Sequence, residues 1–166
     1  MPIAIFLAAV TIGLSFTIGF VATGYGPRVA DRFLERSTDY RADELRDWVR
    51  AHPAAARGYA FPVLFPLDLF FMVFLGGFLA YGSVASGEAL DFEIRFIWLC
   101  PVLPVLYIAA DLIEDVLLAR LLLSPDSITD RSVGMTKAAT RAKFATSILA
   151  IAQTIVLSGL AAVAEP

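Results

Sequence analysis

The sequence has little of the side-chain chemistry on which most soluble enzymes and metalloproteins depend. It contains one cysteine and one histidine, and charged residues make up 17% of its 166 positions. A single cysteine excludes an intramolecular disulfide. The scarcity of sulfur and imidazole ligands argues against haem and against zinc, copper or non-haem iron sites. The net charge of -3 argues against a general nucleic-acid-binding protein.

The motifs of nucleotide binding and nucleophilic catalysis are also missing. No glycine-rich phosphate loop ends in Lys-Ser or Lys-Thr. The single histidine, His52, lies in a polar segment directly before Pro53, so no Ser/His/Asp set can be assembled inside an apolar bundle. We interpret Cys100 as a small buried residue rather than a redox or thioester centre. The sequence does not decide whether the protein is an enzyme.

What the sequence has in abundance is apolar residues. Their fraction is 58%, and the mean hydropathy is +0.74. A bilayer core about 30 Å thick requires about 20 consecutive apolar residues in a spanning helix. We therefore predict an all-α, integral membrane four-helix bundle that forms one transmembrane domain over residues 1–166. Its predicted spans are about 3–25, 61–83, 96–123 and 138–163. The first span is expected to be permanent, because no basic segment precedes it, as a signal peptide would require.

Basic residues predict the orientation of the chain. Seven arginines lie between residues 28 and 57, and five basic residues lie between 120 and 143, whereas Arg95 is the one basic residue between the second and third spans. The positive-inside rule then places the two basic loops in the cytoplasm and both termini outside. Eleven arginines, two lysines and abundant alanine are typical of GC-rich bacteria, so we expect a multi-pass protein of the bacterial inner membrane.

Short helices are expected in the cytoplasmic loops, at about 28–52 and 125–133. Leu45, Trp48 and Val49 have the spacing of an amphipathic helix, either lying on the inner leaflet or serving as a docking site for a partner. The second loop helix would begin at Ser124-Pro125 and end in a turn at Gly134. Pro62 and Pro66 are expected in the first turns of the second span, where a missing N–H donor costs least.

Four carboxylates lie inside the predicted spans, toward their cytoplasmic ends. Charged groups at membrane depth are expensive, so each one indicates a functional or structural role. Three of the acids share one face of the third span, and a tyrosine hydroxyl lies one turn away. Lys143 is the expected counter-ion, with Arg120 and Arg141 at the rim. The candidate ligand- or ion-binding residues are Asp68, Tyr107, Asp111, Glu114, Asp115 and Lys143.

Three interpretations of this acidic pocket stay open. Its members could be structural ion pairs, a site for a small cation or for a cationic or phosphate-bearing ligand, or part of a proton or ion pathway. Oxygen ligands suit hard cations, so the expected metal is Mg²⁺ at Asp68, Asp111 and Asp115.

The corresponding functions are of three classes. The preferred one is a non-enzymatic accessory, assembly or binding subunit of a membrane complex, forming homo-oligomers or contacting other membrane subunits. The alternatives are a Mg²⁺-dependent enzyme acting on a phosphate- or diphosphate-bearing lipid, and an oligomeric proton or cation transporter or channel.

Overall fold

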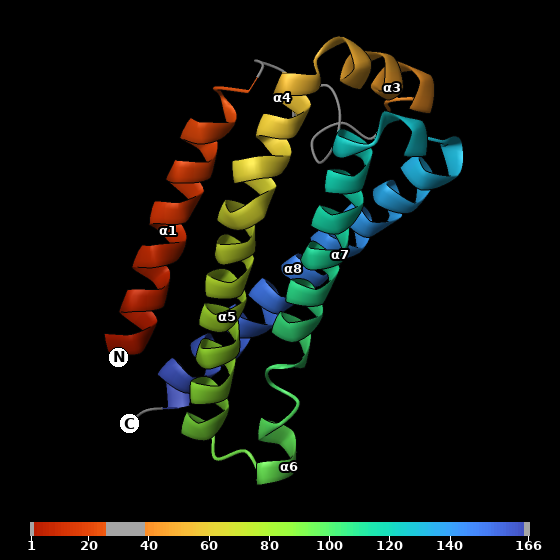
Figure 1. Ribbon diagram of the computed structural model, residues 1–166. Helices are drawn as coiled ribbons and strands as arrows, with labels where there is room; N and C mark the ends of the chain where they lie inside the picture. Colours follow the sequence, from red (N-terminus) through yellow and green to blue (C-terminus); the bar gives the residue numbers. More distant parts are fainter. Residues whose placement is uncertain (1, 26–38, 165–166) are drawn as a thin grey trace.

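A computed structural model describes residues 2–25 and 39–164 of the chain, and this part is all-α, without β-strands. Four helical stretches are long and apolar enough to cross a membrane, which confirms the predicted four-helix bundle (Figure 1). In chain order the elements are α1 (Pro2–Ala22), α3 (Ala42–Ala51), α4 (Pro53–Gly58), the irregular helical segment η2 (Tyr59–Asp68), α5 (Leu69–Ala89), α6 (Ile94–Ile97), α7 (Val102–Leu123), the short turn η3 (Pro125–Ser127) and α8 (Asp130–Ala164).

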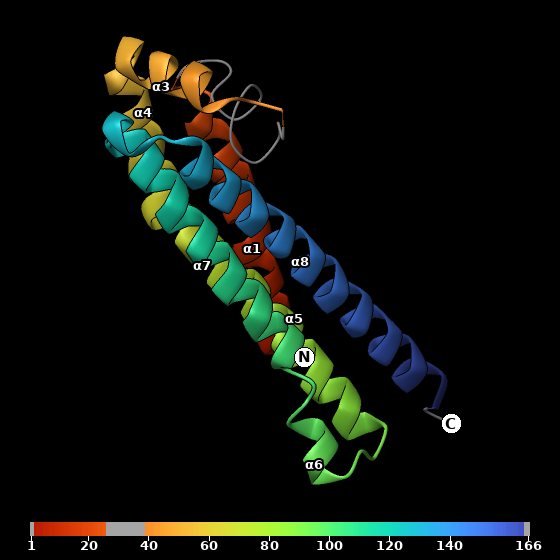
Figure 2. The ribbon, with the colours of Figure 1, turned by 90° about the vertical axis from the view of Figure 1, so that its right-hand side faces the viewer.

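Three of the long helices pack against one another, and the fourth lies beside them. Helices α5, α7 and α8 contact one another, and α1 packs against α5 and η2 (Figures 1 and 2). None of the described residues of α1 is buried. The described chain begins and ends at the α6 end of the bundle, and α3 lies across the opposite end (Figure 1).

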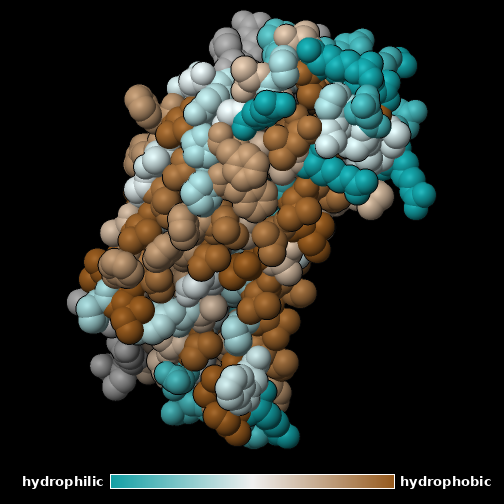
Figure 3. Space-filling view, viewed as in Figure 1, coloured by the Kyte–Doolittle hydropathy of each residue, from teal (hydrophilic) through white to brown (hydrophobic). Residues whose placement is uncertain are grey.

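Apolar side chains cover the outside of the long helices. On α1, Phe16 and Phe20 are 76% and 82% exposed, and similar residues lie on α7 and α8. Figure 3 shows these apolar residues as a broad band, with most of the hydrophilic surface at its two ends. A soluble monomer rarely exposes so large an apolar surface. The described structure is therefore that of a multi-pass membrane protein.

The main cluster of buried apolar residues lies at the α3 end. Leu45 and Val49 of α3 pack there against α4, η2 and the last turns of α7. Arg46 donates to the carbonyl of Ile128, and Arg50 pairs with Asp126 at 2.9 Å. The predicted amphipathic helix is thus present over Ala42–Ala51, whereas the portion predicted over residues 28–38 lies outside the described residues.

The predicted loop helix at 125–133 is wrong. A three-residue turn, η3, occupies its start, and α8 already begins at Asp130, so Gly134 lies inside a helix rather than in a turn. The reason is a reciprocal cap: the Ser132 backbone N–H donates to the Thr129 hydroxyl, and the Thr129 N–H donates to the Ser132 hydroxyl. These bonds satisfy N–H groups at the start of a helix, and they fix the start of α8.

The second membrane-crossing stretch begins earlier than expected, at Pro53. Pro62 and Pro66 therefore fall in its interior instead of its first turns. The residue before each proline, Phe61 and Phe65, has an extended backbone (φ -139°, ψ 113° and φ -127°, ψ 117°). Proline disfavours helical geometry in the residue that precedes it. As a result, regular helix resumes only after Asp68, which lies at the junction between η2 and α5.

Candidate functional site

The candidate site is built first on one face of α7. Tyr107, Asp111, Glu114 and Asp115 are spaced by three or four residues, which places their side chains on a common helical face. The structure turns this face inward: the three acids have no exposed surface, and Tyr107 is 2% exposed. The neighbouring Leu112 and Ile113 face outward. The carboxylates therefore lie inside the bundle and not against lipid tails.

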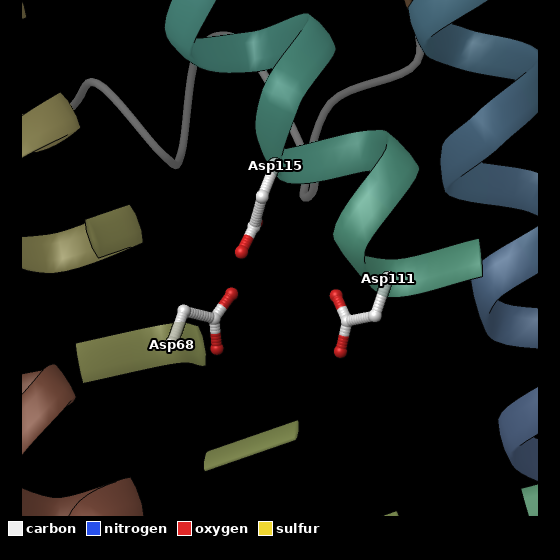
Figure 4. Close-up of side chains that lie close together, drawn as sticks. All are labelled: Asp68, Asp111 and Asp115. Carbon is white, nitrogen blue, oxygen red and sulfur yellow. The ribbon is translucent and has the colours of Figure 1, made fainter. Parts of the chain in front are cut away.

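The fourth carboxylate comes from the junction at Asp68. Figure 4 shows the carboxylates of Asp68, Asp111 and Asp115 turned toward one another across the space between η2 and α7. One oxygen of each lies within 4.8 Å of the other two. A hard cation such as Mg²⁺ or Ca²⁺ takes carboxylate oxygens in an arrangement of this kind, with further ligands from water or from other side chains.

Helix α8 supplies the cation of the site. The Lys143 ammonium lies 2.6 Å from Asp111 Oδ1, 2.9 Å from Glu114 Oε2 and 3.8 Å from Asp68 Oδ2. One turn earlier, the Thr140 hydroxyl donates to Glu114 Oε1. We call Asp68, Asp111, Glu114, Asp115 and Lys143 the carboxylate–lysine cluster. Its members come from three packed elements, so it joins η2, α7 and α8.

The rotation of α8 is fixed by two hydroxyl pairs farther along the same helix. Thr154 contacts Ser83 at 2.9 Å, and Ser158 contacts Ser86 at 3.0 Å, so α8 is attached to α5. Thr140, Lys143, Thr154 and Ser158 lie along one stripe of a helix with 3.6 residues per turn. The hydroxyl pairs therefore direct Lys143 toward the carboxylates.

The two predicted rim residues lie outside this contact network. Arg120 and Arg141 are exposed, on α7 and α8 respectively. Within the described residues, neither one forms an ion pair with the cluster. His52 is also outside the bundle, where its ring stacks on Trp48, and Cys100 is buried near the α6 end.

Sequence reasoning missed Tyr40, which interacts electrostatically with Glu114 from the α3 end of the bundle. Tyr40 is buried, and the Lys137 ammonium donates to its backbone carbonyl at 2.8 Å and lies 4.6 Å from its ring centroid. Burial, and secondarily the negative charge of Glu114, raise the pKa of Tyr40 to about 12. Tyr40 belongs to no recognisable motif, and its distance from Glu114 in the sequence hides the relationship.

Comparison of the chain with protein-family models, curated proteins and solved structures gives no match. The geometry of the cluster and elementary electrostatics are therefore the basis for inferring a function.

Proposed function

We propose that the protein is a non-enzymatic binding subunit of an inner-membrane complex, and that its carboxylate–lysine cluster binds a hard cation. The observation that carries the proposal is the contact of one largely buried ammonium, that of Lys143, with three carboxylates: Asp68, Asp111 and Glu114. One positive charge neutralises one of them. Buried like charges cannot all remain ionised without further compensation, which protons or a bound cation would supply.

The carboxylates of Asp68, Asp111 and Asp115 are the expected ligands. Their oxygens already lie within 4.8 Å of one another, which supports a single ion contacted by all three. Mg²⁺ is the preferred candidate because these three residues offer oxygen ligands alone. Lys143 would then remain beside Glu114, and the two cations would share the charge of Asp111.

Burial favours a binding role over a catalytic one. Asp111, Glu114 and Asp115 have no exposed surface, and the apolar residues of α3, α4 and η2 lie over the α3 end of the site. A lipid phosphate would have to open this packing to reach a bound Mg²⁺. An ion bound there would instead cross-link η2 and α7, and so stabilise the bundle.

In the orientation that we propose, the α3 end of the protein lies in the cytoplasm. The positive-inside rule predicts this orientation, and the position of both described termini at the α6 end agrees with it. In this orientation, the cluster lies in the cytoplasmic half of the membrane.

Helix α1 is the best candidate for contact with other subunits or with a second copy of the chain. It has no buried residue in the described structure, and a Cβ added at Gly13 or Gly19 would meet no atom within 4 Å. Small residues on a membrane helix allow close approach of another helix. Membrane cross-linking through α1 followed by mass spectrometry tests this part of the proposal. Gly19→Trp should reduce the cross-linked product, and Gly77→Trp on α5 is the control.

Thermal unfolding of the purified protein tests cation binding. We expect Mg²⁺ at one hundred times its Kd to stabilise the wild type by about 2.7 kcal/mol. Asp68→Asn and Asp111→Asn should abolish the Mg²⁺ effect, whereas Asp126→Asn, at an exposed residue whose side chain is 88% exposed, should retain it. Equal stabilisation of all four proteins would attribute the effect to the surface and contradict the proposal.

A proton or cation carrier is the second candidate. The observation that favours it is that the Asp68 and Lys143 side chains, at the edge of the cluster, are each 12% exposed. They would give the buried carboxylates a route to the surface. A carrier reconstituted in liposomes should dissipate a pH or cation gradient, and Asp68→Asn should stop this flux. A binding subunit should leave the gradient intact.

A further inference from the structure

A separate, largely open cavity lies at the α6 end of the bundle, near the start of α7 and distant in the fold from the carboxylate–lysine cluster. Its volume is about 560 Å³, within the range of about 300–1,000 Å³ that is typical of small-molecule sites. It is formed between the α5–α6 loop, α6, the segment before α7, and α8. The lining residues are Asp91, Phe92, Glu93, Phe96, Leu99, Cys100, Gln153 and Leu157.

Two hydrogen bonds made by α8 hold the segments around this cavity in place. The Gln153 amide nitrogen on α8 donates to the Cys100 carbonyl at 2.5 Å, and the Ser86 and Ser158 hydroxyls join α5 to α8 at 3.0 Å. The backbone of the α5–α6 loop turns at Asp91, which has a positive φ of 54°. The cavity is thus formed by the fold itself, as most small-molecule sites are.

The lining separates into an apolar part and an acidic part. Phe92, Phe96, Leu99 and Leu157 supply the apolar surface, whereas Asp91 and Glu93 are exposed carboxylates. Arg95 pairs with Glu93 at 2.8 Å but is not among the residues that line the cavity. The described lining therefore has two acids and no basic residue. Arg95 offsets the charge of Glu93, so Asp91 leaves the site with a net charge of about -1, which attracts a cationic head group and repels an anionic one.

We propose that this cavity binds a small cationic amphiphile. Its apolar body would lie against Phe96, Leu99 and Leu157, and its ammonium group beside Asp91 and Glu93. The position suits such a molecule, because α6 lies where the apolar band ends and hydrophilic surface begins (Figure 3). An amphiphile at this depth keeps its charged group in the aqueous interface while burying its chain. The site uses none of the residues of the carboxylate–lysine cluster.

Photolabelling of the full chain in nanodiscs of zwitterionic lipid tests this inference. The probe is dodecylamine with a diazirine in its alkyl chain, and the competitors are dodecylamine, dodecanol and dodecanoate. We expect saturable labelling in residues 91–100 and 153–157. Because Arg95 offsets the charge of Glu93 and both carboxylates are exposed, dodecylamine should compete about threefold better than dodecanol, and dodecanoate should be the weakest. Non-saturable labelling, or equal competition by the three compounds, would overturn the proposal.

Two variants and one control locate the site. Leu157→Trp fills the cavity and should remove most of the labelling, whereas Leu149→Trp, at a residue of α8 that is 53% exposed, should leave it unchanged. The double substitution Asp91→Asn and Glu93→Gln alters exposed residues and should retain the fold. It should equalise competition by dodecylamine and dodecanol, which tests the head-group preference even if Leu157→Trp does not fold. Wild-type behaviour of the double variant would also contradict the inference.

Discussion

The ammonium of Lys143 on α8 lies 2.6 Å from a carboxylate oxygen of Asp111 on α7. Both residues are far from the ends of their helices, and Asp111 has no exposed surface. The pair therefore fixes the position of α7 relative to α8 by a contact that is screened much less than a surface ion pair. Because Lys143 also contacts Asp68 and Glu114, the same contact organises the whole cluster.

Replacing Lys143 with methionine should strongly destabilise the protein. The change keeps a side chain of similar length but leaves Asp111 and Glu114 without their ammonium. Removing one partner of a buried ion pair typically costs about 3–5 kcal/mol. Unfolding in detergent or nanodiscs measures this loss. The matched control is Arg141→Met, two residues earlier on α8, where the side chain is exposed and the expected change is within about 0.5 kcal/mol.

Cation binding makes a further prediction for the same variant. Without the competing ammonium, the carboxylates should bind Mg²⁺ more tightly, so Mg²⁺ should stabilise Lys143→Met more than the wild type. If Lys143→Met is as stable as the wild type in EDTA, the cluster does not contribute the buried charge interaction inferred here.

The buried hydroxyl of Tyr40 predicts a loss of stability at alkaline pH. Its pKa is raised from 10.0 to about 12 by burial and by Glu114, so the folded protein holds this proton more tightly than the unfolded chain. The resulting stabilisation is complete below pH 10 and is lost as the pH rises from 10 to 12. Unfolding free energies measured across this interval should fall more steeply for the wild type than for Tyr40→Phe. Parallel curves for the two proteins would exclude this coupling.

Helix α3 should depend on Leu45 for its attachment to the bundle. Leu45 is fully buried in the apolar cluster at the α3 end, and truncation of such a side chain costs about 2–5 kcal/mol. Leu45→Ala should therefore increase amide hydrogen exchange across residues 42–51. Asp47→Ala changes an exposed residue of the same helix and serves as the control. Unchanged exchange in Leu45→Ala would show that polar contacts such as Arg46 with Ile128 are sufficient to hold α3.

The four long helices could be predicted because membrane insertion imposes a strong and simple pattern. A run of about 20 apolar residues identifies a span without any knowledge of its neighbours. The inward face of α7 could be predicted equally well, since acids spaced by three and four residues must share one side of a helix. Lys143 could be predicted as the counter-ion because few basic residues lie near the carboxylates.

Other features depend on tertiary contacts that the pattern of apolar and charged residues does not reveal. The beginning of α8 was misplaced because a separate loop helix and a turn at Gly134 were expected, whereas the reciprocal bonds between Thr129 and Ser132 start one continuous helix at Asp130. The irregular backbone before Asp68 depends on two prolines acting within a long helical segment. The electrostatic interaction between Tyr40 and Glu114 joins residues that are far apart in the sequence, and the sequence offers no local signal for it.

The most direct test of cation binding is titration of the purified, EDTA-treated protein with Mn²⁺, followed by electron paramagnetic resonance of the free ion. Mn²⁺ accepts the same oxygen ligands as Mg²⁺. We predict one saturable Mn²⁺ per chain, displaced by excess Mg²⁺, lost in Asp111→Asn and retained in Asp126→Asn. The absence of saturable Mn²⁺ binding in the wild type, or its persistence in Asp111→Asn, would contradict the proposal that the buried carboxylates hold a metal ion.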